Sequence, residues 1–278
     1  LKDWKYMAVG ASRFIGQIME NLMCRFHYTK ILTVNSSLKK TFQDKFKIPE
    51  GKILVVPNGI TIKEIDAVKA GKRKDNTLLF VGRLVPQKNV DLLIKAFSEA
   101  LKKMPGLKLE IVGDGFDRER LESLSKELGI GKSTVFLGAM KNNEVLKKIK
   151  ESTIFVMPSK RESFGITILE AMACHTPVIS TATEGPLDYI RNGHNGFLTR
   201  LDDAGDGDAS EMGANIVLLA KNKALRRKIA ANARKTAESY DWDKITDRLI
   251  NIFRDTVKNA MKKQVNGKAT AQKTGLSD

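Results

Sequence analysis

The sequence lacks the features that mark disulfide-rich, metal-binding and membrane-spanning proteins. Its 278 residues include only two cysteines, Cys24 and Cys174, which lie far apart in the chain. We therefore expect neither a disulfide framework nor a zinc or other metal site. No run of about 18 uncharged apolar residues is present, which is the minimum for a helix that spans a bilayer. These absences predict a soluble or peripheral protein in a reducing compartment, the cytoplasm.

A secretory signal is also missing. The chain begins with Leu1 rather than methionine. Its first residues have neither the basic-then-apolar layout nor the small-residue cleavage site of a signal peptide. We interpret the beginning of the sequence as a truncation.

Acidic residues are few compared with basic ones. The chain has 48 lysines and arginines against 32 aspartates and glutamates, which gives a net charge of +16. Such an excess attracts phosphate-bearing partners, namely nucleic acids, anionic membranes or phosphorylated small molecules, but it selects none of them. A solvated basic surface is the alternative explanation. Because RNA-binding signatures, zinc fingers and interleaved basic and aromatic residues are absent, we expect no dedicated nucleic-acid module.

From residue 77 onward, short apolar runs alternate with longer amphipathic segments. This alternation is typical of βαβ units around a parallel sheet, whose buried strands are apolar almost throughout. The predicted strands cover residues 77–82, 107–113, 133–138, 152–159, 176–181 and 196–199. Residues 90–103, 117–128 and 143–152 space their apolar side chains three and four apart, which is the helical period. The pattern therefore predicts an α/β fold with a parallel sheet.

Both ends of the chain depart from this pattern. Residues 28–35, 36–46 and 52–58 are predicted as a strand, a helix with a serine cap and a second strand, the end of a further α/β unit. Segment 58–76 is polar, basic and broken by glycine, so it is our candidate linker. We expect helices from about residue 209 to 263, and a flexible tail over 264–278, which has no apolar periodicity.

The segment GRLVPQKN, residues 82–89, directly follows a predicted strand and opens a helix. It places Gly82, Arg83 and Lys88 at the carboxyl end of a parallel strand, where open α/β sheets bind ligands. Glycine lets a phosphate approach the backbone, and two cations can neutralise a diphosphate. Taken alone, a turn with two solvated cations explains the segment equally well.

The segment ESFGITILEAMA, residues 162–173, is more specific, because it places the carboxylates Glu162 and Glu170 on either side of a strand-to-helix turn. The helix is expected to begin at Phe164 or Gly165, so that backbone amides near its start face outward as anion donors. The alternative is that Glu162 caps the helix and Glu170 is a surface residue. However, Glu170 stands among apolar residues, where burying an unpaired charge is costly.

Six segments, GRLVPQKN, IVGDG, FLGAM, ESFGITILEAMA, PVIST and NGFL, resemble family 4 of the GT-B glycosyltransferases in order and spacing, over roughly residues 55–240. The resemblance implies a GT-B fold with a doubly wound, Rossmann-like donor domain over residues 61–241. Residues 1–60 would be the remnant of a second Rossmann-like domain, which binds the acceptor, and residues 242–263 a C-terminal crossing helix. The implied reaction moves a sugar from a UDP-, GDP- or ADP-sugar to a hydroxyl acceptor, lipid-linked or on a polysaccharide. It proceeds with retention and needs neither a metal nor a cofactor.

The resemblance also implies roles for individual residues. Arg83 and Lys88 match the pair that grips the donor diphosphate, next to Gly82. Glu162 matches the glutamate that contacts the transferred sugar, and Glu170 matches the carboxylate that binds the ribose hydroxyls. The backbone donors to sugar and phosphate match Phe164, Gly165, Ile166 and Thr167, with Ser163 beside them, and the stretch around the base matches Gly113, Ala139 and Met140.

Two other functional classes stay open at this point. One is a nucleotide-sugar isomerase such as a 2-epimerase, and the other is a basic nucleotide- or RNA-binding module without chemistry. If the chain is a transferase, every residue that matches the family pattern lies on its donor side, so we expect the chain alone to bind the donor without transferring sugar. The net charge also predicts attraction to an anionic membrane, where a lipid-linked acceptor would be found.

Overall fold

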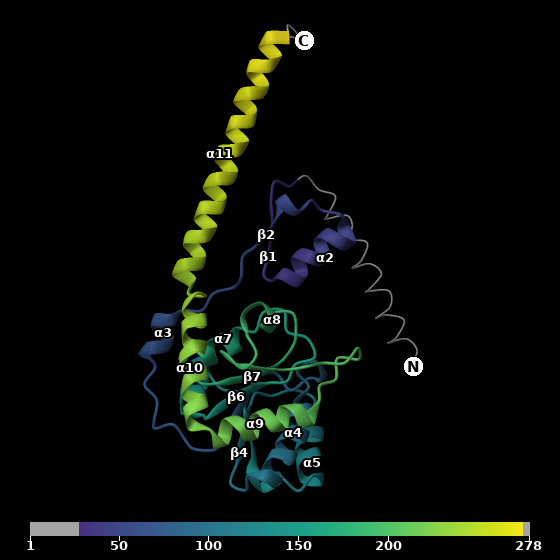
Figure 1. The fold of residues 1–278 in the computed structure, drawn as a ribbon, viewed down its shortest axis with the longest axis vertical. Helices are drawn as coiled ribbons and strands as arrows, with labels where there is room; N and C mark the ends of the chain where they lie inside the picture. Colours follow the sequence, from purple (N-terminus) through teal and green to yellow (C-terminus); the bar gives the residue numbers. More distant parts are fainter. Residues whose placement is uncertain (1–27, 275–278) are drawn as a thin grey trace. The chain divides into compact units, whose positions relative to one another are not determined.

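The computed structural model describes the backbone of residues 28–274 and the side chains of residues 28–262 (Figure 1). Cys24 and the beginning of the chain lie outside this range. The chain divides into two compact units, one formed by Leu1–Val56 with Leu249–Asp278 and the other by Pro57–Arg248. The expected donor domain, residues 61–241, therefore falls inside the second unit.

The first unit contains the strand-helix-strand element that the sequence predicts. Strand β1 (Ile31–Thr33) pairs in parallel with β2 (Ile53–Val55), and helix α2 (Ser36–Phe46) connects them, followed by the short 3-10 helix η1 (Glu50–Lys52). The serine cap is wrong. The carboxamide oxygen of Asn35 instead accepts a hydrogen bond from the Leu38 amide at 2.7 Å, because Asn35 is the residue that keeps extended backbone geometry before the first helical turn.

The second unit is built on one six-stranded parallel sheet. Its strands are β3 (Thr77–Val81), β4 (Lys108–Val112), β5 (Thr134–Gly138), β6 (Ile154–Met157), β7 (Val178–Thr181) and β8 (Phe197–Thr199), in the spatial order β5-β4-β3-β6-β7-β8. The chain thus builds the sheet outward from β3 in one direction and then outward from β6 in the other. This doubly wound arrangement reverses between β3 and β6, and open α/β sheets bind their ligands at the carboxyl ends of the strands beside such a reversal.

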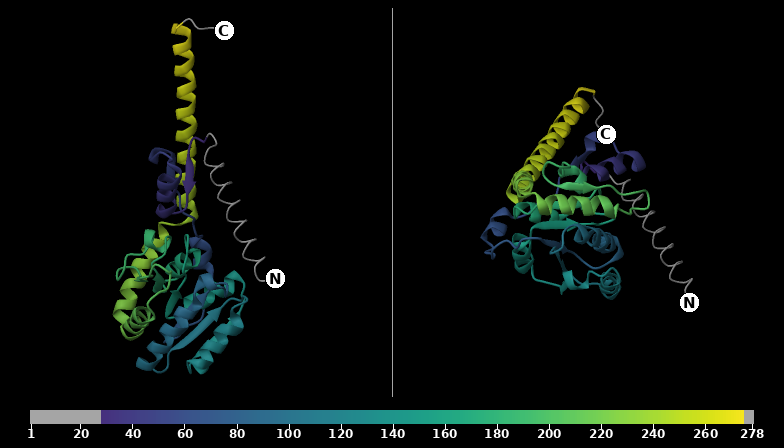
Figure 2. Two further views of the ribbon diagram at one scale, coloured as in Figure 1. Left: turned by 90° about the vertical axis from the view of Figure 1, so that its right-hand side faces the viewer. Right: turned by 60° about the horizontal axis from the view of Figure 1, so that its bottom comes forward.

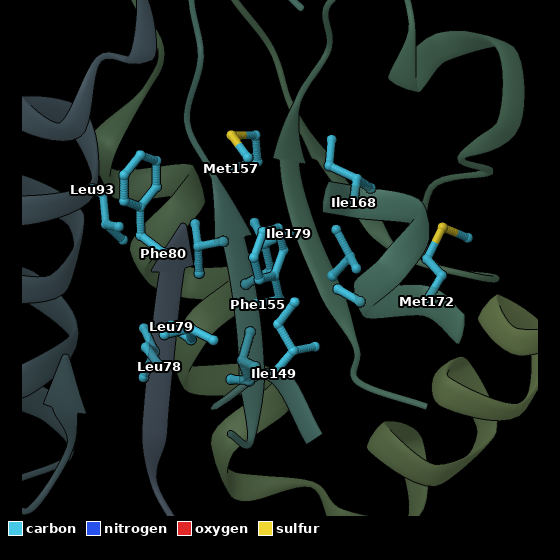
Figure 3. Packing of buried hydrophobic residues seen from close by; sticks show 14 of the residues in the cluster. Leu78, Leu79, Phe80, Leu93, Ile149, Phe155, Met157, Ile168, Met172 and Ile179 are labelled. Atoms are coloured by element: carbon cyan, nitrogen blue, oxygen red, sulfur yellow. The ribbon is translucent and has the colours of Figure 1, made fainter. Parts of the chain in front are cut away.

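Helices cover both faces of this sheet (Figure 2). They are α4 (Val90–Lys103), α5 (Arg118–Glu127), α6 (Asn142–Glu151), α7 (Ile166–Ala173), α8 (Pro186–Tyr189), α9 (Ala209–Lys221) and α10 (Lys223–Glu238), with the 3-10 helices η2 (Pro86–Lys88) and η3 (Gly131–Ser133). Helix α4 packs against α5 and α9, while α7 packs against α6 and α10. Fully buried side chains such as Phe80, Phe155 and Ile179 fill the space between sheet and helices (Figure 3). The burial of such apolar side chains supplies most of the stabilisation of the second unit.

The segment 58–76, expected to be a linker, is in part a packed element of the second unit. It forms helix α3 (Ile62–Ala67), and the side chains of Ile60, Ile62 and Ile65 are buried in the main core. The Ile60 backbone also bonds the chain on either side of Asp241, since its amide donates to the Tyr240 carbonyl and its carbonyl accepts from the Trp242 amide. Three isoleucines in a polar stretch are too few to produce a visible period, so the sequence pattern missed this contribution to the core.

The last helix, α11, spans Trp242–Thr274 and so continues past residue 263, where we expected a flexible tail to begin. The tail prediction relied on a lack of apolar periodicity. Alanine, lysine and glutamine favour helical backbone even where no apolar face is present, and these residues are frequent after residue 263. Although α11 has 33 residues, neither it nor any other helix in the described part of the chain is long and apolar enough to cross a membrane.

Candidate functional site

The residues that the sequence singles out lie in loops at one edge of the second unit's sheet. Gly82, Arg83 and Lys88 follow β3, Gly113 follows β4, and Ala139 and Met140 follow β5. The loop with Glu162 and Gly165 follows β6 and leads into α7. Because all six strands are parallel, their carboxyl ends share this edge. The loops after β3 and β6 flank the reversal of strand order, so the fold places the two specific motifs where a ligand crevice is expected.

Glycine residues allow close backbone contacts between the chain segments that follow β3, β4 and β5. The Gly82 amide donates to the Val112 carbonyl at 3.0 Å, and the Gly113 amide donates to the Gly138 carbonyl at 2.8 Å. Gly113 has a φ of +130°, and a Cβ atom added there would stand 1.8 Å from the Gly82 carbonyl oxygen. No other residue fits this position without moving the backbone. The close backbone contacts therefore fix the loops after β3, β4 and β5 relative to one another.

An ion pair joins the loop after β3 to the loop after β6. Lys88 Nζ lies 2.6 Å from Glu162 Oε2, and the two side chains are 20% and 16% exposed. Two further bonds involve Gln87, whose carbonyl accepts from the Lys160 amide at 2.9 Å and whose carboxamide donates to the Arg161 carbonyl at 3.4 Å. Such a shielded pair resists solvent screening better than a surface pair does. This contact was not predicted from the sequence, although the opposite charges in the two loops beside the reversal point were a signal for it.

Arg83 differs from Lys88 because, among the described residues, its side chain has no ion-pair partner. Its side chain is exposed and, within the part of the chain that the structure describes, forms no hydrogen bond or ion pair. A guanidinium that points into solvent at the carboxyl edge of a parallel sheet is free to take an anionic ligand. The two expected diphosphate-binding cations are therefore in the same loop, with one held by a carboxylate and the other open.

Residues that follow β7 contact the turn at Phe164 and Gly165 and fix its backbone. The Gly185 amide donates to the Glu162 carbonyl at 2.8 Å, and a Cβ atom at Gly185 would stand 2.5 Å from Phe164 Cα. The Tyr189 hydroxyl donates to the Phe164 carbonyl at 2.7 Å. Gly185 and Tyr189 belong to the segment TEGPLDYI, residues 183–190, whose contact with the ESFG turn was not predicted from the sequence. The fixed turn leaves the first two amides of α7, those of Ile166 and Thr167, without a backbone acceptor among the described residues, whereas the Ile168 amide donates to the Gly165 carbonyl at 3.0 Å.

Glu170 is a largely buried carboxyl group in the second turn of α7. In the described residues it has no hydrogen-bond or ion-pair partner for its side chain, so burial raises the pKa of Glu170 to about 7. Glu162 and Glu170 therefore have different environments, one paired with a cation and the other desolvated. Perturbed carboxyl groups of this kind are concentrated at functional sites. Among the side chains of residues 28–262, no three of histidine, cysteine, aspartate or glutamate gather as a metal ion requires.

Comparison with known proteins identifies the chain. The sequence model of the family described as "Glycosyl transferases group 1" matches residues 61–236, which is more than half of the chain and includes every loop described above. The chain belongs to this family. An uncharacterized glycosyltransferase of Methanocaldococcus jannaschii is 35% identical over 239 residues, covering 81% of this chain and 60% of the relative. A D-inositol 3-phosphate glycosyltransferase of Acidothermus cellulolyticus is 28% identical over 231 residues, covering 77% and 50%.

Solved structures show the same fold. A glycosyltransferase from Rickettsia africae superposes with a TM-score of 0.74 at 22% identity, covering 83% of this chain and 64% of that one. The Anabaena protein Alr3699/HepE, solved in complex with UDP and glucose, superposes with a TM-score of 0.73 at 21% identity, covering 86% and 66%. These likenesses confirm the GT-B type α/β fold. The group 1 chain spans about half to two thirds of the length of these proteins.

Proposed function

We propose that this group 1 chain supplies the donor-binding half of a retaining glycosyltransferase, which moves a sugar from a nucleotide-diphosphate sugar to a hydroxyl acceptor. The observation that carries the proposal is the Lys88–Glu162 pair at the reversal point of the sheet, with Arg83 exposed in the same loop as Lys88. A diphosphate needs cations and backbone amides, and a sugar next to it needs a hydrogen-bonding carboxylate. The loops after β3 and β6 bring these groups to one edge.

In the proposed complex, the diphosphate lies against Arg83, Lys88 and the start of α7, and the backbone around Gly82 allows it to approach. Glu162 accepts hydrogen bonds from the transferred sugar, and Glu170 accepts them from the ribose. Backbone groups from Ser163 to Thr167 complete the contacts to sugar and phosphate. The base lies along Gly113 and the Ala139–Met140 stretch.

The reaction that suits this arrangement is cleavage of the bond between the sugar and the diphosphate. Negative charge grows on the leaving diphosphate in the transition state, so cations already in place stabilise the transition state more than the bound donor. The acceptor hydroxyl attacks from the same face of the sugar, and the leaving diphosphate takes the acceptor proton. Fixed cations and helix amides supply this stabilisation without a divalent metal ion.

The experiment that tests the proposal is a thermal-shift screen of the chain against UDP-, GDP- and ADP-sugars. UDP-glucose comes first, because Alr3699/HepE has been solved in complex with it. A donor at a hundred times its dissociation constant stabilises the folded chain by about 2.7 kcal/mol. Stabilisation by none of the nucleotide sugars would contradict the proposal. Conversion of the donor to an isomeric nucleotide sugar in the absence of acceptor would instead favour a 2-epimerase.

The acceptor side is part of the same proposal. The residues assigned to the donor all lie between Gly82 and Glu170, and orientation of an acceptor accounts for several kcal/mol of a transfer barrier, about 7 or more in favourable cases. We therefore propose that the 278-residue chain alone binds the donor but does not transfer it. A radiolabelled-donor assay with sugar, lipid-linked and polysaccharide acceptors checks this. Release of labelled product at a rate of full enzymatic turnover would contradict it.

A further inference from the structure

A strongly basic pocket lies at the amino ends of the strands, at the opposite edge of the sheet from the donor loops. It has a volume of about 520 Å³. Its walls include Lys72, Arg73 and Asp75 before β3, His175 before β7, and Lys223, Arg226 and Arg227 of α10. Since residues before β3 and β7 stand at the amino ends of parallel strands, the pocket is separated from Gly82 and Glu162 by the length of the sheet. Figure 1 shows the segment between α3 and β3 passing the junction of α9 and α10.

Arg73 is fixed in this pocket without any acidic partner. Its guanidinium donates to the carbonyls of Lys150 at 3.2 Å, His175 at 2.8 Å and Cys174 at 3.1 Å, and to the Thr176 hydroxyl at 3.3 Å. These acceptors are all neutral, so they hold the side chain in place but leave its charge uncompensated. Burial lowers the pKa of Arg73, and the positive charge of Arg226 lowers it further.

Arg226 is held in the same way. It donates to the carbonyls of Leu219 and Ala220 at the end of α9, which are neutral acceptors with the negative end of a helix dipole behind them. Burial and the nearby Arg227 lower the pKa of Arg226, and only Asp75 opposes them. The neighbouring positive charges repel one another and create a positive electrostatic potential at this surface. A bound anion would reduce that repulsion.

The three remaining cations, Lys72, Lys223 and Arg227, are exposed at the rim and form no ion pair or side-chain hydrogen bond within residues 28–262. Five lysines and arginines therefore face one carboxylate, that of Asp75. A merely solvated basic face does not require guanidiniums that neutral acceptors hold in place, as they hold those of Arg73 and Arg226. A concave wall with two fixed and three exposed cations has the size and charge of a small-ligand site for phosphate groups.

We propose that this pocket binds a phosphate-bearing ligand, either a free phosphorylated molecule or the headgroup of an anionic lipid. Arg73 and Arg226 form its fixed floor, and Lys72, Lys223 and Arg227 close on the phosphate from the rim. The site is independent of the donor loops and does not rest on their proposed role.

Calorimetric titration with inorganic pyrophosphate tests the proposal, using the full chain with Arg83→Ala so that the donor loops contribute less. The pocket variant adds Lys72→Gln, Lys223→Gln and Arg227→Gln. A matched control adds Lys95→Gln, Lys102→Gln and Lys132→Gln, three exposed lysines outside the pocket, so that the loss of net charge is equal. We expect the pocket variant to lose affinity by at least about tenfold and the control to lose much less. Equal losses in both would overturn the proposal.

A second arm distinguishes the two sources of phosphate. The same variants are sedimented with vesicles that contain phosphatidylglycerol. Pyrophosphate binding that depends on the pocket identifies a free phosphate ligand, and vesicle binding alone with the same dependence identifies a lipid headgroup. If neither probe binds the full chain, the proposal is wrong. The variant Asp75→Asn gives a second test that does not depend on whether the triple variant folds. Removing the opposing carboxylate should tighten the binding of pyrophosphate. Unchanged affinity would count against the site.

Discussion

Lys88 and Glu162, 74 positions apart in the chain, meet through an ion pair of 2.6 Å at the point where the strand order reverses. Their pairing connects the two motifs that the family resemblance treats separately. In the proposed complex, a diphosphate draws Lys88 away from Glu162 or shares it, and the carboxylate is then available to the sugar. Binding of the phosphate and recognition of the sugar are therefore expected to be coupled through this contact.

The pair itself makes the first prediction. Lys88→Met leaves a shielded carboxylate without its partner, and we expect a loss of about 1–3 kcal/mol in the free energy of unfolding. The double variant Lys88→Met/Glu162→Gln removes both charges, so most of this loss should be recovered. Urea denaturation of the wild-type chain, the two single variants and the double variant measures the coupling. Strictly additive losses would show that the contact contributes nothing.

Donor binding in the Glu162→Gln variant is the second prediction. Without the carboxylate, Lys88 is free for phosphate, so UDP should bind as tightly as before or more tightly. The sugar loses an acceptor, so the advantage of UDP-glucose over UDP should shrink by about 1–3 kcal/mol. Calorimetry with both ligands checks this difference. Equal weakening of UDP and UDP-glucose would contradict a sugar-contacting role for Glu162.

The third prediction concerns Arg83, which has no partner of its own among the described residues. Arg83→Ala should weaken UDP binding by about 1.5–3 kcal/mol, because a charge-assisted contact to phosphate is lost. Uridine binding and the thermal midpoint should stay unchanged. Lys95→Ala, another exposed cation but outside the donor loops, is the control for a general effect of charge. A similar loss for uridine would argue that Arg83 does not contact the diphosphate.

The strands of the second unit could be predicted from the sequence because buried parallel strands are apolar throughout. All six were found, and β4 and β7, for example, differ from the predicted ranges by one or two residues at their ends. The Lys88–Glu162 contact could not be predicted in this way. It depends on β6 lying next to β3, and strand order leaves no trace in local periodicity.

Smaller differences have local causes. Helix α3 was missed because the isoleucines that bury it, Ile62 and Ile65, stand in an otherwise polar stretch. At the start of α2, Asn35, Ser36 and Ser37 are all able to cap, and the backbone conformation decides which one does. The role of Gly185 depends on a contact with Phe164 across two loops. Each of these depends on tertiary packing rather than on composition.

The close approach of two loops makes the fourth prediction. Gly113→Ala places a Cβ atom 1.8 Å from the Gly82 carbonyl oxygen at a φ of +130°, so the backbone of one loop must move. We expect a loss of more than about 3 kcal/mol in stability, and weaker nucleotide binding where the protein still folds. Gly129→Ala is the control, because φ is +71° and no atom lies within 4 Å. It should cost only about 1–2 kcal/mol, and an equal cost at both positions would contradict the argument.

Glu170 makes the fifth prediction, which concerns pH. Burial raises the pKa of Glu170 from 4.5 to about 7, so between these values the folded chain keeps a proton that the unfolded chain has released. The contribution of this group to stability is full below pH 4.5, falls as pH rises to about 7 and is constant above it. Glu170→Gln stays neutral, so near pH 8 the variant should be more stable than the wild type by up to about 3 kcal/mol. Denaturation across this range measures the difference, which should vanish near pH 4.5.

Ligand affinity should move in the opposite direction if Glu170 binds the ribose. An ionised carboxylate accepts stronger hydrogen bonds from hydroxyl groups than a neutral carboxyl does, so uridine should bind more tightly as pH rises through about 7. Uridine carries no phosphate, and its affinity therefore reports on the carboxyl group without phosphate ionisation. Glu170→Gln should bind uridine weakly and show no such rise. Two results would contradict this role: a wild-type affinity for uridine that does not change with pH, or a variant that binds uridine as tightly as the wild type near pH 8. Either would show that Glu170 does not bind the ribose and has a structural role instead.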